Sequence, residues 1–326
     1  MKPWLSLILK IGVSAGILTL IASKTDVSKI TGLLTSVGSE AVFLVLCLGI
    51  AQTVVVAYRW VLVMRELGGT VEVWPALQAL YVSLALNQCL PSYVGGDAYR
   101  IYWLYREGNR LAVAARGVVI DRISAIIALV LMMAAGLPLV FARFPEPAAR
   151  TGLIAVLACG LLGTVVFFSC DAVPAAWRRL RVMRELAELS TAARRLLLHS
   201  ASALVIGPLA LVVHLLTAAV MCVFATSLRL PLTFLDCALL MPPMMLLAAV
   251  PVSIAGWGVR EGVVVGALSM VGIGTEPALA LSLLLGVAAL GNGLIGLLPL
   301  VFGGERFVAS RAQYVPTPET TSLLRK

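Results

Sequence analysis

Two ten-residue stretches decide the fold: PSYVGGDAYR at residues 91–100 and PVSIAGWGVR at residues 251–260. Both fit the pattern P-x-x-x-[GA]-G-x-x-x-R without a gap, 160 positions apart. Proline removes a backbone donor and breaks a helix, while glycine permits a tight reversal of the chain. Each stretch lies near the middle of a long apolar segment, 75–105 or 233–274. We therefore predict that each segment forms a helical hairpin with its turn at the motif.

The apolar segments around these motifs predict a membrane protein. The chain has 326 residues, of which 60% are hydrophobic and 13% charged, whereas a soluble domain has about 25% charged residues. A bilayer core about 30 Å thick needs roughly 20 apolar residues per helical crossing. The segments that fit such a crossing are 4–22, 41–63, 116–140, 152–169, 203–225 and 277–301. Broken backbone at membrane depth is tolerated only inside protein or beside a watery cavity, so the two hairpins are predicted to be re-entrant.

Basic residues predict the orientation of these segments. The formal net charge is +9; Arg65 lies in 64–73, further arginines gather in 100–116 and 170–202, and an Arg-Lys pair ends the chain. Six crossings and two hairpins place these regions and the N-terminus on one side, which the positive-inside rule assigns to the cytoplasm. We expect a multi-pass protein of a bacterial inner membrane with both termini cytoplasmic. The basic charge does not indicate nucleic-acid binding, because no soluble module is present to read bases.

The order of the segments predicts an internal repeat. Each half of the chain reads span, span, hairpin, span, and three crossings per half require the second copy to be inverted relative to the first. The predicted fold is thus an all-α polytopic membrane protein with two inverted-topology repeats, each with three spanning helices and one re-entrant hairpin. The membrane domain covers 1–302, with repeats of about 1–150 and 151–302, and 303–326 is expected to be a disordered cytoplasmic tail. Broken helices that meet between inverted repeats are typical of transporter substrate sites.

Positive charge at the motifs indicates an anion site. The helix after each turn presents free N–H groups and its positive dipole end, and the arginine nine residues after the proline adds a fork suited to phosphate. The alternative is a re-entrant turn whose arginine snorkels to the interface. Asp121 and Arg122 lie inside the next span, where ionisable groups face a partner, a cavity or, as an anchor pair, the interface. Adjacent residues point about 100° apart on a helix, so each needs another partner, and Arg100 could serve Asp121.

The residues predicted to line a substrate site are Asn87, Pro91, Ser92, Gly95, Gly96, Asp97, Arg100, Asp121, Arg122, Pro251, Ser253, Gly256, Gly258, Arg260 and Glu261. Asn87 could either hydrogen-bond across its hairpin or face a headgroup. Asp97 and Glu261 could balance the arginines or cap the following helices. Aromatic-belt packing and snorkelling account for the group at 58–60, and 175–198 reads as an amphipathic helix on the inner membrane surface. Six scattered cysteines form no C-x-x-C pair, and no metal or cofactor is predicted.

The motifs resemble those of a known family. Asn87-x-x-x-Pro91 running into GGDAYR at 95–100, VIDR at 119–122 and PVSIAGWGVREG at 251–262 are similar to the lysylphosphatidylglycerol synthase transmembrane (flippase-like) family over roughly 5–305. Its best understood members flip aminoacylated phosphatidylglycerol, and relatives belong to hopanoid or polyprenol-linked glycolipid pathways. Synthase members carry a C-terminal aminoacyl-transferase domain that is not found here. The resemblance therefore implies the translocation part alone.

These observations favour a carrier that moves an anionic lipid between the leaflets. The lipid could be phosphatidylglycerol or its aminoacyl form, a polyprenyl-phosphate-linked lipid or a hopanoid-type lipid. The expected partners are this substrate and the bilayer lipids. One alternative is a non-catalytic scaffold for a lipid-modifying synthase or glycosyltransferase. A lipid-phosphate enzyme is disfavoured, because the sequence has no D-x-x-D-G run, paired histidines or Ser–His–Asp arrangement. We therefore predict that the chain is not an enzyme.

Overall fold

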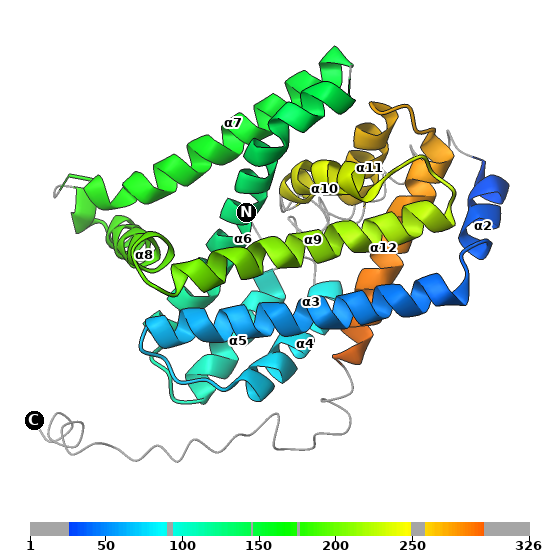
Figure 1. The fold of residues 1–326 in the computed structure, drawn as a ribbon. Helices are drawn as coiled ribbons and strands as arrows, with labels where there is room; N and C mark the ends of the chain where they lie inside the picture. The colour runs from blue at the N-terminus through cyan, green and yellow to red at the C-terminus, as the bar shows by residue number, and fades with distance from the viewer. Residues whose placement is uncertain (1–25, 90–93, 145, 175–176, 249–257, 297–326) are drawn as a thin grey trace, which may run out of the picture.

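The computed structural model describes residues 26–89, 94–144, 146–174, 177–248 and 258–296, and their regular structure is helical throughout (Figure 1). The helices are α2 (Val27–Thr35), α3 (Ser39–Glu66), α4 (Val73–Cys89), α5 (Val94–Arg106), α6 (Leu111–Arg143), α7 (Pro147–Ser169), η1 (Cys170–Ala172), η2 (Trp177–Arg179), α8 (Arg181–Leu198), α9 (Ala203–Ser227), α10 (Phe234–Ala248), α11 (Val259–Ser269) and α12 (Thr275–Ile295). The prediction of an all-α chain is confirmed for this part of the protein.

Five of the described helical segments are long and apolar enough to cross a membrane: Ser39–Glu66, Leu111–Arg143, Arg150–Ala172, Ala203–Ser227 and Thr275–Ile295. Each coincides with a span predicted from the sequence. The first predicted span, 4–22, and the predicted tail, 303–326, lie outside the described residues. Exposed apolar side chains cover the outside of these helices; Leu162 of α7, for example, is 65% exposed. Such a surface suits hydrocarbon rather than water.

Two pairs of short helices separate the long ones. In the first, α4 packs against α5, and in the second α10 packs against α11. These pairs fall on the two segments predicted to be hairpins. Most of the connecting motif residues, 90–93 and 249–257, lie outside the described residues. The paired short helices are therefore observed, whereas their turns are not described.

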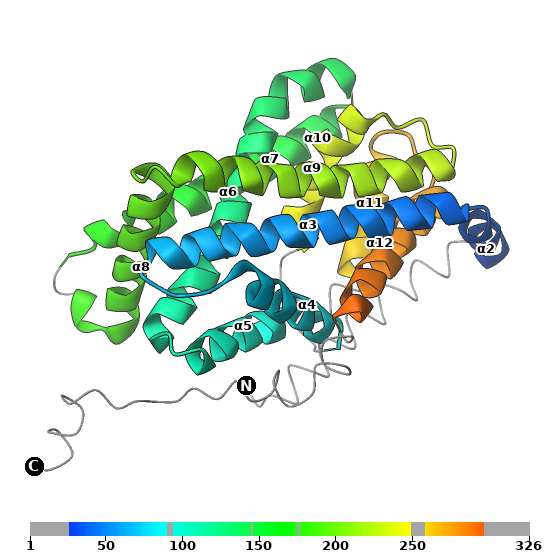
Figure 2. The same ribbon diagram turned by 60° about the horizontal axis from the view of Figure 1, so that its bottom comes forward.

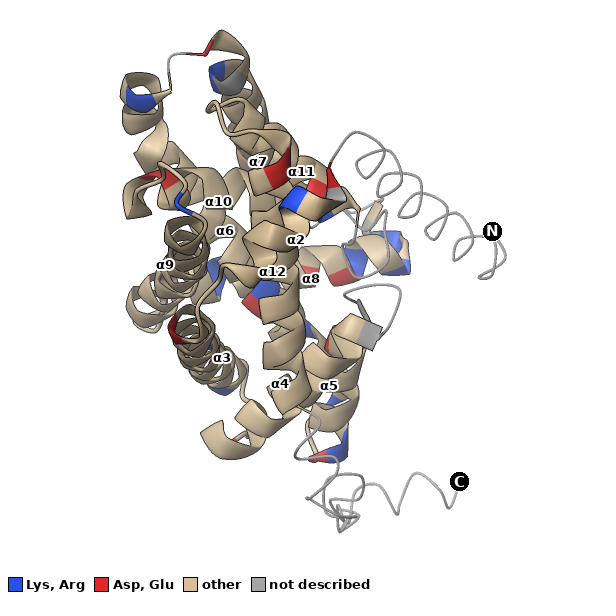
Figure 3. Cartoon of the chain, turned by 90° about the vertical axis from the view of Figure 1, so that its right-hand side faces the viewer, with Lys and Arg blue, Asp and Glu red and all other residues tan. Residues whose placement is uncertain are grey.

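Helices α3 and α9 lie side by side along one side of the bundle, with opposite chain directions (Figure 1, Figure 2 and Figure 3). In the first half of the chain, α3 packs against α4 and α6, and α5 also packs against α6. In the second half α9 packs against α10 and α12, and α11 also packs against α12. Besides the contact of α3 with α9, the halves join where α4 meets α12 and α10 meets α6. Each pair of short helices is thus held by both halves of the chain.

Polar contacts show which helix ends lie at the same end of the bundle. At one end, Ser202 before α9 donates to Glu66 at the end of α3, and Arg116 of α6 pairs with Glu188 of α8. At the other end, Arg143 at the end of α6 pairs with Asp236 at the start of α10. This grouping is the one that the predicted order of spans requires. The ends of α3, α6 and α9 therefore lie where alternate crossings would put them.

One short helix near the start of the described chain was not predicted. The Asp26 side chain accepts a hydrogen bond from the Ser28 backbone N–H at 2.9 Å and so caps the first turn of α2. Hydrogen bonds from the Ser28 hydroxyl and amide hold the pKa of the Asp26 carboxyl below its usual value. A capping aspartate with serine two residues later is the local signal for this helix.

Candidate functional site

A buried ion network occupies the contact between α3, α5 and α6. Asp121 of α6 accepts hydrogen bonds from Arg59 Nε of α3 and from Arg100 Nη2 of α5, both at 2.9 Å. All three side chains are almost fully buried, and Arg100 is only 1% exposed. Ionisable groups inside a membrane protein are expensive and face partners or cavities. Here one carboxylate compensates two guanidinium groups from different helices.

The ring of Trp60 packs against the guanidinium group of Arg100. The Arg100 guanidinium carbon lies 4.0 Å from the ring centroid of Trp60, a distance typical of cation–π contacts. Trp60 is itself fully buried, and its ring centroid is 6.0 Å from that of Trp103. The aromatic face is therefore part of the shell that holds a guanidinium in an apolar interior. Within the described residues, Arg100 Nε and Arg59 Nη1 have no hydrogen-bond partner.

The network extends from this interior to the surface. Asp97, one turn before Arg100 in α5, accepts hydrogen bonds from Arg122 Nε and Nη2, both at 2.9 Å, and lies 3.5 Å from Arg100 Nη1. Arg122 is 49% exposed. Among the described residues, three guanidinium groups share two carboxylates, Asp97 and Asp121, so the formal charge of this cluster is positive. A half-exposed ion pair thus leads directly to a buried one.

The packing of α4 on α5 fixes the start of this arginine helix. Asn87 of α4 is buried, and its side-chain oxygen accepts a hydrogen bond from the Gly96 backbone N–H at 2.9 Å. A Cβ at Gly96 would collide with the Ser83 carbonyl oxygen and lie 2.6 Å from the Asn87 oxygen. Gly96 is therefore needed for close approach of the two helices, and Asn87 satisfies an amide at the N-terminus of α5.

A second, smaller network lies at the start of α11. Glu261 is fully buried, and its Oε1 lies 3.0 Å from Arg260 Nε and 3.5 Å from the Ser282 hydroxyl of α12. Its other oxygen accepts a hydrogen bond from the Gly258 backbone N–H at 2.5 Å. Gly258 has φ of 86°, a conformation that glycine adopts without strain. Arg260 crosses directly over Gly286 of α12, where any larger residue would clash with its guanidinium.

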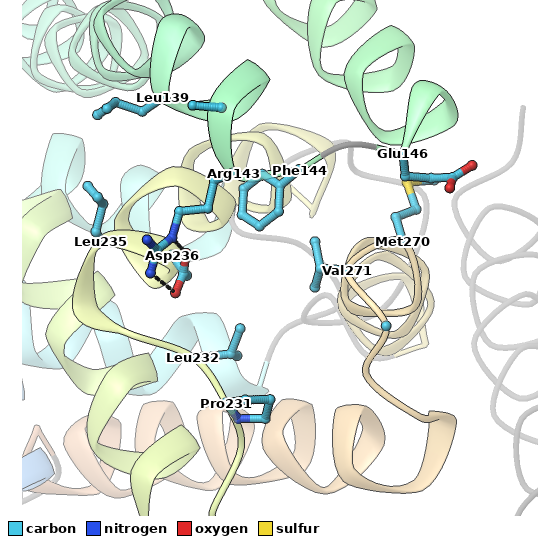
Figure 4. A pocket seen from close by; sticks show the side chains of 12 residues that line it. Leu139, Arg143, Phe144, Glu146, Pro231, Leu232, Leu235, Asp236, Met270 and Val271 are labelled. Carbon is cyan, nitrogen blue, oxygen red and sulfur yellow. Dashed lines mark hydrogen bonds and ion pairs between the residues drawn. The ribbon is translucent and has the colours of Figure 1, made fainter.

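A cavity of about 760 Å³ opens at the end of the bundle where α6, α10 and α11 meet (Figure 4). Arg143 points across it to Asp236, with Nη2 to Oδ2 at 3.2 Å, and Thr233 also donates to this carboxylate. An apolar pocket of about 230 Å³ adjoins the cavity and shares Phe144, Met270 and Val271 with it. A polar mouth therefore continues into an apolar slot between helices.

A comparison with protein families identifies the chain. The family model described as "Lysylphosphatidylglycerol synthase TM region" matches residues 7–296. The chain belongs to this family. No match was found among curated proteins. Membership of the lysylphosphatidylglycerol synthase TM-region family gives the chain a membrane role in lipid handling. The resemblance drawn from the motifs is confirmed.

The structure places the predicted site residues of this family member in two separate networks. In the first half, Asn87, Gly96, Asp97, Arg100, Asp121 and Arg122 come together, and Gly95 lies half-buried in the first turn of α5. In the second half, Gly258, Arg260 and Glu261 come together. The remaining predicted residues, Pro91, Ser92, Pro251, Ser253 and Gly256, lie outside the described residues. Of the roles considered for Asn87, the structure contains the hydrogen bond between α4 and α5.

Arg59 of the first network differs from its prediction. The sequence predicts that it snorkels to the interface, but the structure shows it buried and bound to Asp121. Aromatic-belt packing is also wrong for Trp60, which is fully buried, whereas Tyr58 is exposed as expected. An arginine in the middle of an apolar span is the signal that could have revealed the pair, because such a charge needs a partner. Arg143 and Asp236 were not among the predicted site residues either.

Proposed function

We propose that this chain carries an anionic lipid across the membrane, with the headgroup bound at the Asp97–Arg122 pair and Arg100. The observation that carries the proposal is the positively charged network that runs from half-exposed Arg122 to buried Asp121. A phosphate entering at Arg122 would compete with Asp97 for the same guanidinium fork. Because three guanidinium groups share two carboxylates there, a monoanionic headgroup would neutralise the cluster.

Inverted repeats with re-entrant hairpins are part of the same proposal. The contacts of α3, α4, α5 and α6 with one another have counterparts among α9, α10, α11 and α12. The contacts between halves correspond as well, since α4 with α12 matches α10 with α6. The corresponding long helices of these halves, α3 and α9, run in opposite directions. This correspondence supports a two-fold relation in the membrane plane, which is a common basis for alternating access.

The cavity at Arg143 supports a second opening for the lipid. It lies at the end of α6, whereas Asp121 and Arg122 lie within the first half of that helix. Its apolar neighbour could receive an acyl chain while the polar mouth holds a headgroup. Rocking of one repeat against the other would expose the headgroup to each leaflet in turn. We assign the Arg122 end to the cytoplasm, because arginines concentrate in the loops at that end.

Transport is tested in proteoliposomes that contain phosphatidylglycerol with a fluorescent headgroup label, or the corresponding polyprenyl phosphate. Dithionite destroys the dye in the outer leaflet, so movement from the inner leaflet appears as further loss of fluorescence. The protein should accelerate this loss above that of empty vesicles. Arg122→Gln should slow it at least tenfold without unfolding the protein, because Arg122 is half-exposed and its ion pair adds little stability.

The matched control is Arg106→Gln, an exposed arginine in the last turn of α5, the short helix that packs against α6. It should transport like the wild type. Loss of fluorescence no faster than in empty vesicles, with every lipid offered, would refute the carrier. A scaffold for a lipid-modifying enzyme would then be favoured if complementation in cells were retained by both variants.

A further inference from the structure

Helix α8 lies across the ends of the long helices. Figure 1 looks down the axis of α8, whereas α3, α7 and α9 run across the picture. It packs against the end of α7, the start of α9 and the first part of α6. A helix perpendicular to spanning helices at their ends lies parallel to the membrane surface. α8 is therefore placed at the level of the lipid headgroups.

One face of α8 is fixed to the bundle. Ala187, Ser190, Ala193 and Leu196 are buried beneath it. Three ion pairs fix the helix along its length: Arg116 of α6 binds Glu185 and Glu188, and Arg194 binds Asp171 at 2.9 Å. Both acidic residues of α8 are thus engaged with the bundle. In the described part of the chain, Arg181 and Arg184 near the start of α8 form no ion pair.

Residues 177–184, which comprise η2 and the first turn of α8, carry an exposed surface that is both apolar and basic. We call this segment the 177–184 tip. Its exposed apolar residues are Trp177, Leu180 and Val182, and its exposed basic residues are Arg179, Arg181 and Arg184. Trp177 is 60% exposed. Figure 3 shows basic positions gathered at one end of α8, followed by acidic ones. The tip follows α7, whose outer side is covered by exposed valine and leucine.

We propose that the 177–184 tip is an anchor that binds the surface of a leaflet rich in anionic lipid. Tryptophan and leucine among arginines are the residues that enter the boundary between headgroups and acyl chains. The arginines favour anionic over neutral lipid, because each basic residue near an anionic surface increases the partition of the segment into that surface by roughly fivefold. This proposal rests on the position of α8 and does not depend on lipid transport. A soluble protein partner is the competing occupant, but three exposed arginines beside a lipid-facing helix favour lipid.

The test is hydrogen exchange of the whole protein in nanodiscs of phosphatidylcholine alone and with 30 mol% phosphatidylglycerol. Anionic lipid should slow exchange in peptides covering 180–184, and 0.5 M NaCl should reverse this effect by screening the charges. The variant with Arg179→Gln, Arg181→Gln and Arg184→Gln should lose this slowing by anionic lipid. Three arginines together account for a change of about a hundredfold in partition into the anionic surface. Quenching of Trp177 by brominated phosphatidylglycerol, measured as the difference from Trp177→Phe, provides a second readout.

The matched control removes three other exposed arginines from the same end of the bundle, as Arg65→Gln, Arg106→Gln and Arg110→Gln. It should keep the response of the tip to anionic lipid. Equal exchange in both lipid mixtures would overturn the proposal and favour a protein partner. The proposal would also fail if the control variant lost the response as fully as the tip variant, since attraction would then be a property of the whole basic end.

Discussion

The buried carboxylate Asp121 provides the sharpest test of the ion network. Asp121→Asn keeps the size of the side chain but removes its charge, so that Arg59 and Arg100 lose their shared counter-ion. Both arginines are buried, and each is 2.9 Å from an Asp121 oxygen. Removing one partner of a buried pair costs about 3–5 kcal/mol, because the remaining charge is left uncompensated. We expect a loss in the free energy of unfolding of this size.

Two further variants make this prediction specific. Asp97→Asn removes a carboxylate that pairs with half-exposed Arg122 and lies 3.5 Å from buried Arg100; because Arg100 keeps Asp121 as a counter-ion, a loss of only about 1 kcal/mol is expected. Arg59→Met in the Asp121→Asn background removes one of the uncompensated charges and should recover part of the lost stability.

The assay is reversible unfolding in mixed micelles, followed by tryptophan fluorescence, with the wild type and the three variants in the same detergent. An equal or smaller loss of stability for Asp121→Asn than for Asp97→Asn would show that Asp121 is not the main counter-ion of the buried arginines. A further loss on adding Arg59→Met to Asp121→Asn would contradict the prediction as well, because Arg59 would then be stabilised by something other than this carboxylate.

Two other predictions concern local packing and pH. Gly96→Ala should destabilise the protein by about 1–3 kcal/mol, because the added Cβ meets the backbone of α4. The control Gly163→Ala has open space around it and should leave the stability unchanged. Unfolding in micelles measures both variants, and equal effects would contradict the close approach of α4 and α5. Asp26 has a lowered pKa in the folded protein, so its cap stabilises α2 above the ordinary pKa of aspartate and is lost as pH falls toward the lowered value. Hydrogen exchange in α2, corrected for the intrinsic rate, should therefore become faster in acid for the wild type and stay constant for Asp26→Asn. The same pH profile in both proteins would argue against the cap.

Much of the fold follows from local features of the sequence. The apolar length of each long segment predicts its helix, because only a helix satisfies its own backbone in lipid. The proline and glycine motifs predict where the two apolar segments divide into α4 with α5 and α10 with α11. The sequence also predicts that Asp121 needs a partner on another helix, because adjacent residues on one helix cannot pair with each other. Arg100 is the partner named from the sequence, and the structure contains this pair.

Other features depend on how distant segments pack. Arg59 is 62 positions from Asp121, and Arg143 is 93 positions from Asp236, so no local pattern relates the members of either pair. An arginine in an apolar span has two outcomes, snorkelling or burial against a carboxylate, and the neighbouring helix decides between them.

The amino-acid sequence alone predicts that the chain is helical, where its long helices lie and which motifs carry charge, because these properties depend on composition and on spacing along one helix. The burial of Arg59 with Asp121 depends instead on tertiary packing, since the contacts of α3 and α5 with α6 bring two arginines to this carboxylate. The position of α8 across the bundle is likewise a tertiary property, because its ion pairs with Arg116 of α6 and with Asp171 fix one side of the helix and leave the 177–184 tip exposed.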